Sequence, residues 1–433
     1  MMLDYLIRNA QVITMDDSSP VVSGSIGISC GRIAFIGSEP AGVSSKETID
    51  AAGNIIMPGL INTHGHSAMT VLRGYADDYA LKPWLFDKIF PAEAKLDRNA
   101  VIAGTRIAIA EMLASGTTSF SDMYFYEPDV ARLVSETGIR ASLSNGITAF
   151  SDDFCFEKDR AVTETMELIR NWHGFDGGRI RADAAIHGEY TSKPWIWEKT
   201  AELAYEHDLI TQIHISETKS EHAECISRYG LTPVQVLEKY GVFRNRVIAA
   251  HGVWLCSKDV EILAEHHASV AHNPVSNLKL ASGIADIDEL ISRGVNVSLG
   301  TDGCASNNNL DLFEEIKLSA LLAKHIHNDP TKINAYRALK LATVNGAKAQ
   351  GRENEVGMLK VGMEADLIML DIHKAKLQPI YDPISTVVYS ASGSDVCLTM
   401  VKGKILYRYG EYSTIDIEKA FYDLNRTAEA LKQ

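Results

Sequence analysis

The hydrophobic and polar positions divide the chain into two β-rich ends and a long centre of alternating strand-like and helix-like segments. Near the N-terminus, DYLIRNAQVITM and GSIGISCGRIAFIG alternate hydrophobic with polar residues or carry β-branched ones, which predicts short β-strands. The same pattern returns near the C-terminus in ADLIMLDI, TVVYSASG and VCLTMVKGKILYRYGEY. We therefore expect residues 1–55 and 355–412 to pair into one small β-sandwich domain, with a C-terminal helix over residues 413–433.

The centre, residues 56–354, predicts an α/β fold of the (β/α)8 TIM-like barrel type. Hydrophobic segments that end in polar or small residues recur there, and helix-like stretches such as RNAVIAGTRIAIAEMLAS separate most of them. In such barrels the chemistry lies at the carboxyl ends of the strands. The eight segments are residues 55–66, Thr117–Met123, Ile139–Gly146, Ile180–Tyr190, Leu209–Glu217, Arg246–Val253, Ser269–Ser276 and Val295–Gly303.

Histidine and carboxylate residues gather at these strand ends. His64 and His66 end the first strand, and side chains two residues apart in a strand project from the same face. Imidazole and carboxylate are ligands that suit zinc or iron, and a catalytic ion also needs an open position for water. Such a set could be supplied by His64, His66, His214 and Asp302. Further candidates at strand ends are His187, Glu217, His251 and His272.

Each of these signals is weak when taken alone, because a single H-x-H pair or a single buried histidine is often structural. Their joint occurrence at five or six ends of one barrel is difficult to explain by packing. We therefore expect one divalent metal ion per subunit.

The composition limits the function classes. The 433 residues carry a formal charge of −14, which argues against nucleic acid or an anionic membrane as a partner. No signal peptide and no apolar run of about 18 residues is visible, and the six cysteines form no C-x-x-C pair. We expect a cytoplasmic protein that acts on a small molecule.

The motifs PGLINTHGH, HISE, AAHGV, HNPVSNLKL and LGTDGCASNN resemble those of the amidohydrolase superfamily, as does GMLKVGMEADLIMLD in the C-terminal β region. ADAAIHGEY at the fourth strand contains no lysine that could bridge two ions, which favours the mononuclear sites of the deaminase branch. The resemblance implies one zinc ion, or alternatively iron(II), bound by His64, His66, His214 and Asp302.

The same residues suggest a mechanism of hydrolytic deamination. Asp302 could accept a proton from the attacking water, and His251 could orient or polarise that water. A protonated Glu217, three residues after His214, could donate a proton to a ring nitrogen of an amino-heterocycle. These assignments make Glu217, His251 and Asp302 the candidate catalytic residues.

A second resemblance narrows the substrate. RGYADDYALKPWLFDKIFPAEAKL is similar to the corresponding segment of the 5′-methylthioadenosine/S-adenosylhomocysteine deaminases. It implies that Trp84 packs beside the purine, that Glu93 binds the ribose hydroxyls, that His187 contacts the ligand, and that Ser306 lies beside the purine pocket.

The chain departs from that family where arginines bind the amino-acid carboxylate of S-adenosylhomocysteine. One such position is Asn145, and the other falls near Arg160, displaced by about one residue. Loss of a bidentate arginine weakens carboxylate recognition, so 5′-methylthioadenosine, 5′-deoxyadenosine and adenosine remain open as substrates beside S-adenosylhomocysteine.

Other functions also remain open. A guanine, pterin or cytosine deaminase, or a triazine hydrolase, would share most of the metal ligands but would not need Glu93 with Trp84. An inactive binding or assembly protein of this fold would leave the metal site empty. A binuclear amidase would need the missing lysine. We expect a homo-oligomer, as is common among similar enzymes.

Overall fold

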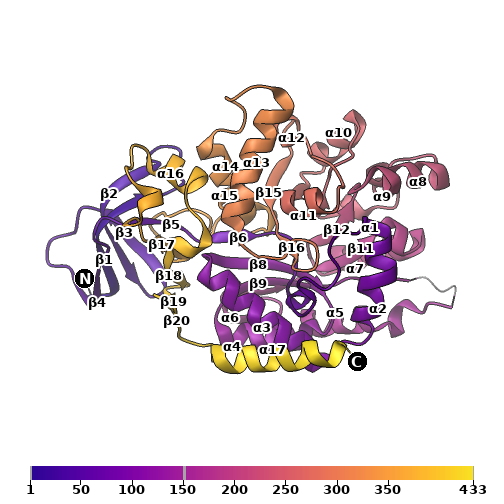
Figure 1. Ribbon diagram of the computed structural model, residues 1–433, viewed down its shortest axis with the longest axis horizontal. Helices are drawn as coiled ribbons and strands as arrows, with labels where there is room; N and C mark the ends of the chain where they lie inside the picture. Colours follow the sequence, from indigo (N-terminus) through magenta and orange to yellow (C-terminus); the bar gives the residue numbers. More distant parts are fainter. Residues whose placement is uncertain (1, 150–152, 433) are drawn as a thin grey trace.

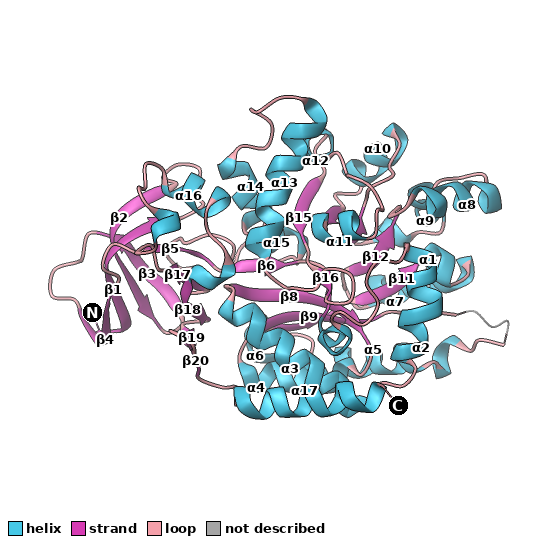
Figure 2. Ribbon diagram, in the orientation of Figure 1, coloured by secondary structure: helices cyan, strands magenta, loops and turns pink. Residues whose placement is uncertain are grey.

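The computed structural model describes residues 2–149 and 153–432, which form a mixed α/β molecule with a β-rich part at one end (Figure 1). Figure 2 shows strands concentrated in that part and in the interior of the larger part, where helices surround them. Among the described residues, no helix combines the length and hydrophobicity that crossing a membrane requires.

The β-rich part is a nine-stranded sheet that both ends of the chain build together. Its order is β20-β19-β18-β17-β5-β1-β2-β3, with β4 paired to β1. The N-terminal and C-terminal strands meet where β5 pairs antiparallel with β17. Alternate residues such as Val12, Ile28, Met369 and Leu398 are buried in one hydrophobic cluster. The strands are β1 (Met2–Ile13), β2 (Val21–Ser29), β3 (Arg32–Gly37), β4 (Ser44–Asp50), β5 (Ile55–Pro58), β17 (Leu367–Leu370), β18 (Val396–Val401), β19 (Lys404–Arg408) and β20 (Glu411–Tyr412).

The strand prediction for TVVYSASG is wrong, because Thr386–Tyr389 lie in helix α16 (Pro383–Tyr389). Pro383 occupies the first turn of this helix, and the Asp382 carboxylate accepts a hydrogen bond from the backbone N–H of Ile384 at 3.0 Å. Val387 and Val388 are buried in the main hydrophobic cluster. The β-branched run therefore reflects burial of one helix face rather than a strand.

Gly59 lies between β5 of the terminal sheet and β6 (Leu60–Asn62) of the central region. A Cβ atom at this position would lie 2.1 Å from Thr118 Oγ1, so only glycine allows the chain to pass this close to the neighbouring strand. The motif PGL thus brings the chain from one sheet directly into the other.

The central region contains two parallel sheets, one four-stranded (β10-β9-β8-β6) and one five-stranded (β11-β12-β13-β14-β15). Only Asp183 separates β10 from β11, so the predicted fourth strand passes from one sheet to the other. At the opposite edges, the N–H of Thr63 donates to Leu299 O at 2.9 Å. The strands not yet named are β7 (Gly65–His66), β8 (Thr117–Tyr124), β9 (Arg140–Asn145), β10 (Ile180–Ala182), β11 (Ala184–Gly188), β12 (Thr211–Ile215), β13 (Val247–His251), β14 (Ser269–His272), β15 (Asn296–Leu299) and β16 (Asp302–Gly303).

Helices follow most of these strands and pack on the outside of the sheets. The predicted C-terminal helix is α17 (Ile417–Leu431), which packs along α3 (Arg98–Ala114) at the lower edge of Figure 1. The other α-helices of four residues or more in the described chain are α2 (Phe90–Glu93), α4 (Glu127–Thr137), α5 (Arg160–Asn171), α6 (Phe175–Gly178), α7 (Pro194–Glu206), α8 (Lys219–Tyr229), α9 (Pro233–Lys239), α10 (Ser257–Glu265), α11 (Pro274–Lys279), α12 (Ile287–Ser292), α13 (Leu312–His327), α14 (Ala335–Leu341) and α15 (Val344–Ala349).

Candidate metal centre and active site

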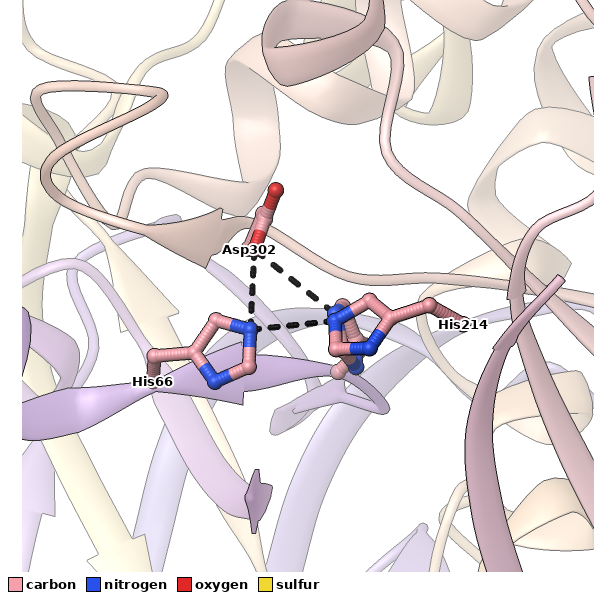
Figure 3. Close-up of side chains that lie close together, drawn as sticks. His66, His214 and Asp302 are labelled. Carbon is pink, nitrogen blue, oxygen red and sulfur yellow. Dashed lines mark hydrogen bonds and ion pairs between the residues drawn. The ribbon is translucent and has the colours of Figure 1, made fainter. Parts of the chain in front are cut away.

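Four predicted ligands converge at the carboxyl ends of the strands. His64 follows β6, His66 lies in β7, His214 in β12 and Asp302 in β16, and one ligand atom of each lies within 4.8 Å of the others. His66 Nε2 is 3.2 Å from His214 Nε2 and 3.3 Å from Asp302 Oδ1. Figure 3 shows the rings of His66 and His214 facing one another beside Asp302. Residues separated by more than 230 positions in the sequence therefore form one buried cluster.

The cluster fits a divalent cation. Both ring nitrogens of His64 are buried without a hydrogen-bond partner among the described residues, although buried polar atoms are normally partnered. His66 donates from Nδ1 to Met123 O at 2.6 Å, and His214 donates from Nδ1 to His187 O. These bonds leave the Nε2 lone pairs facing the common centre, as in metal-binding histidines.

Burial and the neighbouring carboxylate shift the pKa values of two of the histidines in opposite directions. Burial lowers the pKa of His64 to about 4. Burial also disfavours a charge on His66, but its interaction with Asp302 outweighs burial and raises the pKa of His66 to about 9. A divalent ion would displace the proton of His66, because metal binding requires the neutral imidazole.

The Asp302 carboxylate is fully hydrogen-bonded by its surroundings. Its Oδ1 accepts from the N–H of Gly303 at 2.8 Å. Its Oδ2 accepts from the hydroxyls of Ser276 at 2.6 Å and Ser306 at 3.0 Å. Burial opposes ionisation, but contacts with the two histidines hold the pKa of Asp302 well below its usual range. Asp302 is therefore a fixed anion at the centre.

His251 and Glu217 lie beside this cluster. His251 donates from Nδ1 to Asn277 Oδ1 at 2.8 Å, so its Nε2 carries the lone pair and lies 3.7 Å from Glu217 Oε2. Ser282 Oγ donates to Glu217 Oε1 at 3.0 Å. Burial raises the pKa of Glu217. A buried carboxyl with a raised pKa beside a histidine is suited to proton transfer.

Backbone strain is concentrated at the same strand ends. His251 has φ 74°, Asp302 has φ 60° and Ser216 has φ 50°, all in the left-handed region that non-glycine residues seldom adopt. Each such residue costs roughly 1–3 kcal/mol, and such strain is typical of functional sites.

A cavity of about 340 Å³ opens beside the metal cluster, a size that suits a small-molecule ligand. Three of the predicted substrate residues, Glu93, Arg160 and His187, line it together with His66. The rest of its wall is largely apolar and includes Met69, Leu85, Phe90, Met123 and Phe125.

The remaining predicted substrate residues lie elsewhere. Asn145 is buried, and neither of its side-chain polar atoms has a hydrogen-bond partner within the part of the chain that the structure describes. It lines a chamber of about 90 Å³ that shares Tyr124, Phe125 and Arg160 with the main cavity. Trp84 is buried in the adjoining hydrophobic cluster, outside the cavity wall. The hydroxyl of Ser306 is directed to Asp302, so Ser306 supports the carboxylate.

Three buried groups next to the cluster have altered pKa values. Burial lowers the pKa of His187 and of His272 to about 3, so both are neutral at physiological pH. Burial raises the pKa of Glu93 to about 7, although the neighbouring Tyr124 phenol partly opposes this.

The sequence did not indicate several residues that contact the site. Ser276, Asn273 and Asn277 lie in the motif HNPVSNLKL. The Asn277 side-chain oxygen accepts from His251 Nδ1 at 2.8 Å, and Asn273 Nδ2 lies 3.4 Å from the same nitrogen. No pattern in the sequence signals Tyr124, whose side chain lines the cavity.

Comparison with known proteins gives full-length matches. A model described as the amidohydrolase family matches residues 55–406. A 5′-deoxyadenosine deaminase of Methanosarcina mazei is 46% identical over 99% of both chains. A 5-methylthioadenosine/S-adenosylhomocysteine deaminase of Acetivibrio thermocellus is 43% identical over 99% of both chains. The crystal structure of an adenosine deaminase from Xanthomonas campestris with bound zinc has a TM-score of 0.93 at 33% identity, covering 100% of this chain and 99% of that one.

Proposed function

The chain belongs to the amidohydrolase family and is a hydrolase of carbon–nitrogen bonds, and on this premise we propose that it deaminates adenosine-type nucleosides in a metal-dependent reaction. The family resemblance expected from the sequence is thereby confirmed. The observation that carries the proposal is the buried His64, His66, His214 and Asp302 cluster, which adjoins a cavity containing Glu93 and His187.

We propose that these four residues hold one zinc ion. Three imidazole nitrogens and one carboxylate oxygen suit zinc, and the solved adenosine deaminase of similar fold contains zinc. When bound, such an ion lowers the pKa of a coordinated water from 15.7 to about 7, which supplies a nucleophile at neutral pH. Iron(II) would suit the same ligands, and metal analysis of the purified protein separates the two.

The residues of the chain supply the proton transfers. Glu217, whose pKa is raised by burial, donates a proton to the ring nitrogen next to the amino-bearing carbon, which makes that carbon electrophilic. Asp302 accepts one proton from the attacking water while the oxygen bonds to the carbon, and His251 Nε2 orients that water. The proton on Asp302 then passes to the amino group, the carbon–nitrogen bond breaks and ammonia leaves. The second water proton returns to Glu217.

Nucleoside recognition is proposed for the cavity residues. Glu93 accepts hydrogen bonds from the ribose hydroxyls and His187 contacts the purine, while Trp84 supports the cavity wall from the adjoining hydrophobic cluster. Among the described residues that line the Asn145 chamber of about 90 Å³, Arg160 is the one arginine, and the acids Asp159 and Glu164 lie beside it. This supports a small neutral 5′ group over a charged amino acid, in keeping with the 5′-deoxyadenosine deaminases among the relatives.

We also propose the domain architecture, the cellular compartment and the oligomeric state of the protein. The two parallel sheets, hydrogen-bonded at Thr63–Leu299 and continuous through Asp183, are proposed to close into one (β/α)8 barrel over residues 56–354. The terminal sheet, residues 1–55 and 355–412, is proposed to form the sandwich domain. A cytoplasmic protein without a nucleic-acid partner is proposed on the acidic charge of −14 and the scattered cysteines. A homo-oligomer is proposed because similar enzymes are often oligomeric.

The test is ammonia release from a panel of adenosine, 5′-methylthioadenosine, 5′-deoxyadenosine, S-adenosylhomocysteine, adenine and guanine. We expect the nucleosides to turn over and the free bases to remain unchanged, with the small 5′ groups favoured over S-adenosylhomocysteine. If guanine were the best substrate, the ribose role of Glu93 would have to be abandoned.

A further inference from the structure

Tyr124 is a cavity residue with an unmet hydrogen-bonding group. It is the last residue of β8, is 4% exposed and lines both the main cavity and the Asn145 chamber. Its phenol oxygen is buried without a hydrogen-bond partner among the described residues. Glu93 Oε1, on the same cavity wall, is also buried and without a partner.

The position of Tyr124 is fixed by its surroundings. Its ring packs against Phe125 with centroids 4.1 Å apart and lies 6.3 Å from the ring of His66. The phenol and the Glu93 carboxyl are close enough to shift each other's pKa, but Tyr124 Oη and Glu93 Oε1 form no hydrogen bond among the described residues. A buried polar group left without a partner costs roughly 1–3 kcal/mol, so two such groups facing one cavity indicate a ligand that satisfies both.

The chemistry of the two groups complements a vicinal diol. Each hydroxyl offers one donor and accepts through its oxygen, whereas an ionised carboxylate can only accept. In its ionised form, Glu93 alone satisfies the diol hydrogens and leaves the diol oxygens without a donor. A phenol O–H at the same wall supplies the missing donor, and its high pKa in this buried position keeps that donor protonated.

We propose that Tyr124 donates a hydrogen bond to a ribose hydroxyl oxygen and thereby, together with Glu93, makes the enzyme specific for ribonucleosides over deoxynucleosides. This inference rests on the proposed function and adds a specificity-determining residue to it.

The test compares Tyr124→Phe with the wild-type enzyme on adenosine, 2′-deoxyadenosine and 3′-deoxyadenosine. Loss of one neutral hydrogen bond should raise KM for adenosine about tenfold with little change in kcat. The kcat/KM preference for adenosine over at least one deoxynucleoside should fall by a similar factor, because the analogue already lacks the hydroxyl that Tyr124 binds. The double variant Glu93→Gln/Tyr124→Phe should lose a smaller factor in kcat/KM for adenosine than the product of the factors lost by the two single variants. The effects are not independent, because both groups act on the same diol.

Thr105→Val provides the matched control. Thr105 in α3 is fully buried, its hydroxyl also has no partner among the described residues, and it does not line the cavity. Thr105→Val should keep the wild-type preference for adenosine over the deoxynucleosides. Thermal unfolding should show that Thr105→Val and Tyr124→Phe are both folded. Tyr124→Met, which also lacks the hydroxyl, replaces the phenylalanine variant if that protein does not fold.

Two failures can be told apart. If the wild-type enzyme released ammonia from no nucleoside, the proposed function would fail. If the wild-type enzyme were active, and Tyr124→Phe kept both adenosine-to-deoxynucleoside preferences within threefold of wild type, only the role of Tyr124 would be overturned.

Discussion

Single hydrogen bonds decide which atom of each residue faces the substrate. The backbone carbonyls of Met123 and His187 accept from Nδ1 of His66 and His214, and Asn277 does the same for His251. In each ring this leaves Nε2 as the nitrogen that can bind an ion or accept a proton. The chemistry therefore depends on groups that do not themselves take part in it.

Glu217→Gln tests the proton donor. The amide is nearly the same size but cannot deliver an acidic proton, so kcat should fall by roughly 10²–10⁴. Because Glu217 is not a ligand, the metal content of the variant should match that of wild type by elemental analysis. Ser292→Ala, on the surface of α12, is the control variant and should keep the wild-type kcat and metal content. Undiminished activity in the glutamine variant would remove Glu217 from the mechanism.

Asp183 gives a pH-dependent prediction away from the metal cluster. It is buried, it accepts from Gln212 Nε2 at 2.9 Å, and burial raises its pKa from 3.8 to about 7. Between these values the unfolded chain loses the proton while the folded one keeps it. The stability that this group contributes is therefore complete below about pH 4 and is lost as the pH rises towards 7.

Asp183→Asn should remove this dependence. We compare the free energy of unfolding of the variant minus that of wild type at two pH values. This difference should be more favourable to the variant at pH 8 than at pH 5, by an amount on the order of a few kcal/mol. Urea unfolding at the two pH values measures the difference. A constant difference between variant and wild type at both values would show that Asp183 is already ionised in the folded protein.

At the scale of elements, the loop after β12 is held by the helix that follows it. Glu221 in the first turn of α8 accepts hydrogen bonds from the N–H groups of Ser216 at 2.9 Å, Glu217 at 2.7 Å and Thr218 at 3.3 Å. Thr218 in turn caps the helix by accepting from the N–H of Glu221. This reciprocal cap fixes the loop that carries Glu217.

Glu221→Ala should therefore impair catalysis without removing a catalytic group. Three N–H groups lose their acceptor, the loop loosens, and we expect kcat to fall by about 10–100-fold, as for a small misplacement of a reacting group. Glu221→Gln keeps one acceptor oxygen and should recover part of the activity. Equal activity of the alanine and glutamine variants, both at the wild-type level, would show that the loop needs no such anchor.

At the scale of the whole molecule, a buried ion cluster joins the terminal sheet to the parallel sheets. Arg140 on β9 is fully buried and contacts Asp366 through Nε at 2.9 Å and Glu364 through a terminal nitrogen at 2.5 Å. Both acids immediately precede β17. The guanidinium thus fixes the terminal sheet against the region that carries the site.

Arg140→Met should destabilise the protein by about 3–5 kcal/mol, because it removes the buried guanidinium that pairs with both Glu364 and Asp366. The urea midpoint should fall accordingly. Arg246→Met provides the control, since Arg246 pairs with Glu353 at the surface and exposed pairs contribute about 1 kcal/mol or less. Similar losses in the two variants would contradict a special role for the Arg140 cluster.

The sequence by itself determined the features that depend on local order. Histidines and acids at strand ends, the helix-like stretches between strands and the family motifs indicated the α/β fold, the ligand set and the deaminase chemistry. Such features can be predicted because strand and helix periodicity act over a few residues, and the carboxyl ends of parallel strands necessarily meet.

Only the tertiary structure decided which groups contact one another and how deeply each is buried. It placed TVVY on a buried helix face, directed Ser306 to Asp302 and placed Trp84 outside the cavity wall. It also left the Tyr124 phenol oxygen without a hydrogen-bond partner among the described residues. Each of these outcomes depends on residues that are distant in the sequence, because burial and hydrogen-bond partners arise from packing between elements rather than from the pattern within one.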